Sequence, residues 1–115
     1  MTKRELIDYC LAHFECYEDY PFDAVTAVMK LSSNHKMFCL IAERSGTVYI
    51  NLKCNPDEAI ELREQFEGIT EGYHMNKKHW NTVVTESDVP FELLERMIAQ
   101  SYHLVKPKRK LRGSQ

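Results

Sequence analysis

The sequence lacks the motifs and long apolar runs that identify most enzymes and membrane proteins. None of the G-x-S-x-G, H-E-x-x-H, P-loop or dinucleotide-binding patterns occurs in it, so no motif predicts a catalytic reaction or a cofactor. No apolar run approaches the roughly eighteen residues of a membrane span, and charged residues interrupt the N-terminal segment where a signal peptide would lie. We therefore expect a non-enzymatic, cytoplasmic protein without a cofactor or a membrane segment.

Paired cysteines are also absent. The four cysteines form no C-x-x-C pair and lie on or beside different predicted elements, at Cys10, Cys16, Cys39 and Cys54. Paired spacings are typical of zinc sites, and small secreted domains are usually dense in disulfides. We expect reduced and mostly buried thiols.

Positive charge is scarce in most of the chain and concentrated at its end. The 115 residues suit one globular domain, expected at residues 1–105, followed by a basic, mobile tail at residues 106–115. Residues 1–95 carry nine Lys and Arg against seventeen Asp and Glu, a balance of −8, whereas residues 96–115 carry six basic residues and no acid. Because an acidic body repels a polyphosphate, any contact with nucleic acid would be local.

Hydrophobic periodicity predicts three helices and five strands. Capping signals place helices from Thr2 to about residue 13, from an Asn55 cap to Gly68, and from Asp88 to just before Pro107. Strands are expected at about 25–31, 36–44, 47–54, 69–75 and 79–85, and the acidic residues 15–23, which include Pro21, are expected to form a loop. The order α-β-β-β-α-β-β-α predicts a two-layer α+β domain, in which a five-stranded antiparallel sheet carries helices mainly on one face.

The strand at 47–54 is expected to have one buried and one exposed side. Its apolar side chains alternate with Tyr49, Asn51 and Lys53. Because successive side chains of a strand point to opposite faces, these three are candidates for an exposed binding face. The same pattern is also that of an ordinary solvated strand.

Residues 73–83, Tyr-His-Met-Asn-Lys-Lys-His-Trp-Asn-Thr-Val, combine basic, polar and aromatic side chains. Asn76, Lys77 and Lys78 are expected at the tip of a hairpin, where they could contact phosphates. Alternatively, they form a polar turn in which Asn76 takes a positive φ and the lysines aid solubility. Trp80 is expected chiefly to pack in the core, with stacking on a base or ligand as the alternative.

Several segments resemble the MmcQ/YjbR family of small bacterial proteins. The resemblance covers about residues 6–105 and is carried by Glu18-Asp19-Tyr20-Pro21-Phe22, Lys36-Met37-Phe38, Leu52-Lys53-Cys54, Ser101-Tyr102 and, most specifically, the run from Gly72 to Val83. It implies an α+β fold likened to secretion chaperones and frataxin-like sheets, and a "double wing" mode of DNA binding. Glu71 and Asp23 stand where family members often have proline and glycine, which adds acid beside two shared motifs.

On this basis we predict a nucleic-acid-binding site and no catalytic or metal site. Its predicted residues are Lys53, His74, Asn76, Lys77, Lys78 and His79, with Lys108, Arg109 and Lys110 of the tail. DNA is the expected partner of a monomer or weak dimer. The alternative is a protein-interaction or chaperone-like module that uses the exposed sheet face, as a monomer or as a dimer.

Three other arrangements stay open on the residues alone. The acidic segment 15–23 could bind a cation, although its spacing fits no calcium loop. His74 and His79 could join Cys54 or Glu71 at a zinc site, and Cys54 could pair with His79 as nucleophile and base. No second ligand pair and no catalytic motif supports these arrangements.

Overall fold

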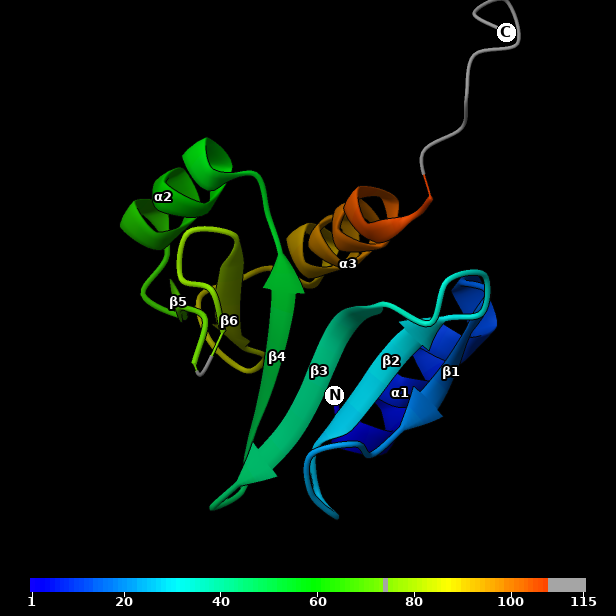
Figure 1. The fold of residues 1–115 in the computed structure, drawn as a ribbon. Helices are drawn as coiled ribbons and strands as arrows, with labels where there is room; N and C mark the ends of the chain where they lie inside the picture. The colour runs from blue at the N-terminus through cyan, green and yellow to red at the C-terminus, as the bar shows by residue number, and fades with distance from the viewer. Residues whose placement is uncertain (74, 108–115) are drawn as a thin grey trace, which may run out of the picture.

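A computed structural model describes residues 1–73 and 75–107 (Figure 1). Its helices are α1 (Lys3–His13), α2 (Pro56–Gln65) and α3 (Phe91–Val105). Its strands are β1 (Cys16–Asp19), β2 (Ala27–Leu31), β3 (Met37–Arg44), β4 (Thr47–Lys53), β5 (Ile69–Glu71) and β6 (Trp80–Val84). The strands form one antiparallel sheet in the order β1-β2-β3-β4-β6-β5. The predicted α+β class is confirmed.

The predicted number of strands is wrong, because a sixth strand forms inside the segment predicted as a loop. β1 pairs with β2 from Cys16 opposite Leu31 to Asp19 opposite Val28. All four β1 residues are partly exposed, so the strand has no buried and exposed alternation by which to be predicted. Pro21 lies beyond the strand, where its missing N–H removes no bond of the ladder.

All three helices pack on one face of the sheet. α1 contacts β1 to β3, α3 contacts β3 and β4, and α2 contacts β5 and β6; α1 and α3 lie behind the sheet in Figure 1. The main core fills this interface, and its fully buried large side chains include Leu6, Ile7, Met29, Phe38, Ile41, Ile50, Ile69, Val83 and Ile98. Removal of this apolar surface from water is the main force that fixes the helices to the sheet.

The predicted local signals mostly form. Thr2 and Glu5 make the expected capping box of α1, and Ser45 and Gly46 both take positive φ angles in the turn between β3 and β4. The predicted side-chain cap at Asn55 is wrong, since the Asn55 side chain makes no capping hydrogen bond. Pro56 occupies the first position of α2, as predicted. In the described residues, no helix combines the length and the apolar character needed to cross a bilayer.

The four cysteines are free thiols. Cys10, Cys39 and Cys54 are buried and Cys16 is partly buried, as predicted. Burial raises the pKa of Cys16 and that of Cys54 to about 11. These thiols therefore stay protonated at neutral pH and act as small apolar side chains.

Candidate binding face of the sheet

The face of the sheet that the helices leave uncovered, here called the open face, carries a second and smaller apolar cluster. The cluster contains the buried residues Val28, Leu40 and Trp80, with Met37 and Met75 packed against them. Trp80 is 8% exposed, so the prediction that it is a packing residue is confirmed. It packs on the open face, however, and not in the main core beneath the helices.

The predicted alternation along β4 is confirmed. Its residues alternate between partly exposed and buried from Thr47 to Lys53, which directs Tyr49, Asn51 and Lys53 to the open face. Lys53 is the Cα partner of Trp80 on β6. The predicted site residue Lys53 therefore lies on the same face as the apolar cluster.

The basic loop, residues 75–79, is organised by Asn76. The side-chain oxygen of Asn76 accepts the backbone N–H of Lys78 at 3.0 Å, and its carbonyl accepts those of His79 and Trp80 at 3.1 and 3.0 Å. Among the described non-glycine residues, positive φ occurs only at His35 and Ser45. The positive φ considered for Asn76 is therefore wrong, because the side chain closes the turn by hydrogen bonding.

The structure brings most of the predicted site residues to one end of the open face. The backbone N–H of Cys54 donates to the carbonyl of His79 at 2.7 Å, which continues the β4–β6 ladder and sets Lys53 beside the basic loop. Lys77 and Lys78 follow in that loop, where both are exposed. The other predicted residues, His74, Lys108, Arg109 and Lys110, lie outside the described part of the chain.

The lysines at this end have no acidic partner within the described residues. All salt bridges among the described residues use Arg4, Lys30 or the N-terminal amine as the cation. Lys77 Nζ lies 3.4 Å from the Gly72 carbonyl oxygen, a contact that leaves its charge uncompensated. Lys53, Lys77 and Lys78 are thus available for an anion.

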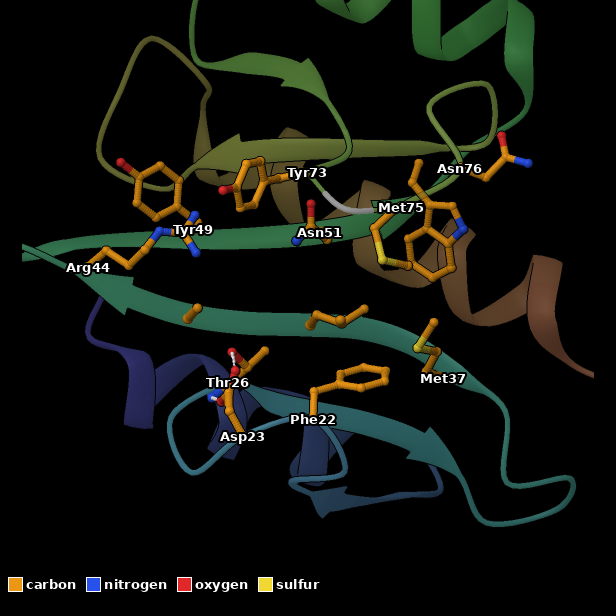
Figure 2. Close-up of a pocket in the computed structure, with 13 residues that line it drawn as sticks. Phe22, Asp23, Thr26, Met37, Arg44, Tyr49, Asn51, Tyr73, Met75 and Asn76 are labelled. Carbon is orange, nitrogen blue, oxygen red and sulfur yellow. Dashed lines mark hydrogen bonds between the residues drawn. The ribbon is translucent and has the colours of Figure 1, made fainter.

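A groove of about 510 Å³ runs along the open face from the basic loop to the far ends of β3 and β4. Figure 2 shows Asn76 and Met37 at one end and Arg44 and Tyr49 at the other. The lining residues are Phe22, Asp23, Thr26, Met37, Leu40, Ala42, Arg44, Tyr49, Asn51, Tyr73, Met75, Asn76 and Trp80. They come from β3, β4 and β6 and from the loops before β2 and β6.

Arg44 closes one end of this groove between aromatic rings. Its guanidinium carbon lies 4.6 Å from the ring centre of Tyr49 and 5.3 Å from that of Tyr73. Sequence reasoning missed Arg44 because it is a single charge beside a turn. The tight turn at residues 45–46 was the available signal, since it sets Ala42 opposite Tyr49 and Arg44 opposite Thr47, which makes Arg44 the diagonal neighbour of Tyr49.

Thr82 links two residues that line the groove, Tyr73 and Asn51, by hydrogen bonds. The Thr82 hydroxyl accepts the backbone N–H of Tyr73 at 3.0 Å and donates to the side-chain oxygen of Asn51. These bonds fix the orientation of the Asn51 amide. Within the described residues its NH₂ group has no hydrogen-bond partner and remains a free donor at the groove.

Carboxylates of the acidic segment 15–23, considered above as a cation site, are engaged in ion pairs with basic side chains. Glu18 binds Arg4 in a two-pronged ion pair at 3.0 and 3.2 Å, and Asp19 binds Lys30 at 2.8 Å. Hydrogen bonds from these cations lower the pKa of both carboxyls. Among the described residues, no group of three or more His, Cys, Asp or Glu side chains is placed to hold a metal.

Cys54 and His79 meet through their backbones. The Cys54 thiol itself is buried and contacts the carbonyl of Leu52. A protonated, buried thiol is a poor nucleophile. The geometry therefore gives no support to the nucleophile and base pair considered from the sequence.

Comparison with known proteins places this chain in a family. The family model described as YjbR matches residues 11–104. The protein named YbdF of Escherichia coli O157:H7 is 36% identical over 86 residues, which cover 75% of this chain and 69% of YbdF. YyaQ of Bacillus subtilis is 31% identical over 118 residues, which cover 92% of this chain and 99% of YyaQ. Both relatives are named as uncharacterized proteins.

Solved structures agree with this relationship. A Deinococcus radiodurans protein with a DUF419 domain superimposes with a TM-score of 0.85 at 35% identity, covering 97% of this chain and 83% of its own. A Pseudomonas syringae protein superimposes with a TM-score of 0.81 at 27% identity, covering 92% of this chain and 100% of its own. The fold is thus shared over nearly the whole domain.

Proposed function

The chain belongs to the YjbR family, and we propose that it binds DNA through phosphate contacts made by Lys53 and the basic loop. One observation carries the proposal. The β4–β6 ladder brings Lys53, Lys77 and Lys78 to one end of the open face, and no carboxylate of the described residues pairs with them. Cations without acidic partners are the groups that bind phosphate oxygens.

The acidic body makes this contact local and gives it an orientation. Residues 1–95 carry a balance of −8, so most of the surface repels a phosphate backbone. A duplex would approach with the end that holds the basic loop, and the tail would add its own positive charge. Such contacts fix position without selecting a base sequence, so we expect weak sequence preference.

The test is DNA binding by the double variant Lys77→Ala/Lys78→Ala over a series of salt concentrations. Each phosphate contact contributes about −0.9 to the slope of log K against log salt. The double variant should lower the magnitude of that slope by about two and weaken binding at low salt by about tenfold or more. Fluorescence anisotropy of a short labelled duplex measures both quantities.

The matched control is Arg96→Ala, which removes an exposed positive charge from α3, the helix side of the sheet. It should leave the slope almost unchanged. Equal losses in the control and the loop variant would mean that net charge alone drives binding and would contradict a local site. Absence of binding by the unmodified chain at low salt would refute the proposal outright.

A further inference from the structure

We propose that the groove on the open face is a binding site for a small carboxylate with an apolar body. In this arrangement Arg44 and the Asn51 amide bind the carboxylate, and the floor formed by Leu40 and Ala42 receives the apolar body. The site is separate from the phosphate contacts of the basic loop. It rests on the charge, the donors and the shape of the groove, and it stands whether or not the chain binds DNA.

The positive end of the groove is prepared for an anion. Arg44 has no carboxylate within salt-bridge distance in the described residues, and Tyr49 and Tyr73 flank its guanidinium at 4.6 and 5.3 Å. Stacking on ring faces holds the guanidinium plane while its N–H edge stays free to donate. A carboxylate matches this edge with two parallel hydrogen bonds.

Asn51 supplies a second donor at the same site. Its oxygen is occupied by the Thr82 hydroxyl, which the Tyr73 backbone N–H holds in turn. The amide is thereby fixed with its NH₂ group as the donor available to a ligand. Figure 2 shows Asn51 on the wall between Arg44 and Met75. A ligand whose carboxylate binds Arg44 and whose apolar body extends towards Met75 would therefore lie beside the Asn51 amide.

The single acid of the groove does not compete for Arg44. Both oxygens of Asp23 are engaged, because they accept the backbone N–H groups of Val25 and Thr26 and the Thr26 hydroxyl at 2.9, 2.6 and 3.0 Å. These bonds lower the pKa of Asp23 and hold it in the turn before β2. Asp23 therefore stays ionised but makes no ion pair with Arg44 within the described residues, so the Arg44 guanidinium remains open to the carboxylate of a ligand.

The remaining lining is apolar and adaptable. Leu40 and Ala42 form the floor, and Met37, Met75 and Trp80 surround the end away from Arg44. Methionine side chains adjust to ligands of different shape. A volume of about 510 Å³ falls in the range of small-molecule pockets, and it suits a ligand with one ring or a short alkyl chain.

Trp80 provides the measurement, because it is the only tryptophan of the chain and lines the groove. The probe is phenylbutyrate, and its neutral amide phenylbutyramide is the matched control ligand. Both carry the same apolar body, and only the acid can form the ion pair. We expect saturable quenching or a spectral shift of Trp80 with the acid, at an affinity about tenfold above that of the amide.

Two variants locate the ligand. Arg44→Gln should lower the affinity for phenylbutyrate about tenfold and leave the affinity for phenylbutyramide unchanged. Arg96→Gln, the same change on the helix side, should change neither affinity. Ala42→Leu should fill the space above the floor of the groove and lower the affinity for both ligands. Amide NMR spectra establish that each variant is folded, and Arg44→Gln alone still decides the question if Ala42→Leu is not.

Three results would overturn the proposal. The first is no saturable change with phenylbutyrate at millimolar concentration. The second is equal binding of acid and amide, or undiminished acid binding by Arg44→Gln. The third is self-association that Ala42→Leu abolishes, measured by sedimentation, which would identify a second copy of the chain as the occupant.

Discussion

The Ser101 hydroxyl completes the hydrogen bonding of two strands where the ladder between them stops. It accepts the backbone N–H of Lys53 at 2.9 Å and donates to the carbonyl of Phe38. The β3–β4 pairing ends at Cys39 opposite Leu52, beside the irregularity at which β2 and β3 shift register. A side chain from α3 thus replaces the missing strand partner.

Ser101→Ala should destabilise the fold through this gap. Ser101 is fully buried, so its removal leaves a backbone donor and a backbone acceptor without partners or water. Such losses cost about 1–3 kcal/mol, and chemical denaturation would measure the decrease in the free energy of unfolding. Ser33→Ala, at an exposed serine, is the control. An equally small effect of both changes would show that the Ser101 bonds contribute little.

The same residue links stability to the candidate site. Because Ser101 holds the backbone of Lys53, it also fixes where the Lys53 side chain leaves the sheet. The sequence singles out Ser101 as one of the residues that carry the family resemblance, without indicating a contact with the strands. Its second role depends on the strand irregularity, and the sequence contains no local signal for that irregularity.

At the scale of elements, Asp88 ties the segment before α3 to the start of β5. Its carboxylate oxygens accept the backbone N–H groups of Glu67 and Gly68, both at 2.8 Å. A β-carbon on Gly68 would lie 2.0 Å from the Ser87 hydroxyl oxygen, so the close approach of the two segments requires glycine. The hydrogen bonds lower the pKa of Asp88.

This contact predicts a pH dependence of stability. Because the pKa of Asp88 is lower in the folded chain than in the unfolded chain, its contribution is complete above the unfolded value and is lost as the pH falls through the folded value. Asp88→Ala should therefore lower the melting temperature at neutral pH, and the difference from the unmodified chain should shrink below about pH 4. Thermal denaturation over a pH series measures both effects.

Glu61→Ala, at an exposed acid on α2, is the control for that series. It should leave the melting temperature nearly unchanged at neutral pH. If the difference caused by Asp88→Ala stayed constant down to the acid limb, the carboxylate charge would not be the source of the stabilisation. The effect would then come from packing.

The helices and strands could be predicted where a local sequence pattern determines them. The helices and the strands β2, β3 and β4 form close to their predicted positions, because caps, tight turns and alternation are local. β1 was missed because a half-exposed edge strand is held by its neighbour and not by its own pattern. β5 and β6 are shorter than predicted, since β5 ends at Glu71 and Asn76 closes a turn just before β6 begins at Trp80.

The candidate site likewise has a part that could be predicted from local sequence and a part that could not. Lys53 and the basic loop were predicted because they stand out in composition. The groove was not, because Arg44 and Asn51 become neighbours of Met75 only through the pairing of β3, β4 and β6. Long-range pairing of this kind is not encoded in any short window.

At the scale of the molecule, charge is distributed so that the two proposed ligands meet different features. Phosphates would bind at the end with Lys53, Lys77 and Lys78, and a carboxylate would bind at Arg44, at the other end of the groove. Met75 and Asn76 line the groove and belong to the basic loop. If occupation of the groove changes DNA affinity, DNA must change carboxylate affinity by the same factor.

The tail gives the last prediction, because its charge is opposite in sign to that of the rest of the chain. Residues 108–115 carry Lys108, Arg109, Lys110 and Arg112 and no acid. A chain that ends at Pro107 should bind DNA with a salt slope smaller in magnitude by up to about four, since each lost phosphate contact removes about 0.9. The Lys77→Ala/Lys78→Ala change should reduce the remaining slope further, by about two.

Carboxylate binding separates loss of the tail charge from loss of the fold in this experiment. The shortened chain should bind phenylbutyrate with unchanged affinity, because the groove is lined by residues 22–80. Trp80 fluorescence measures that affinity on the same sample that is used for anisotropy. A slope that does not change on truncation would show that the tail makes no phosphate contacts, and DNA binding would then rest on Lys53 and the basic loop alone.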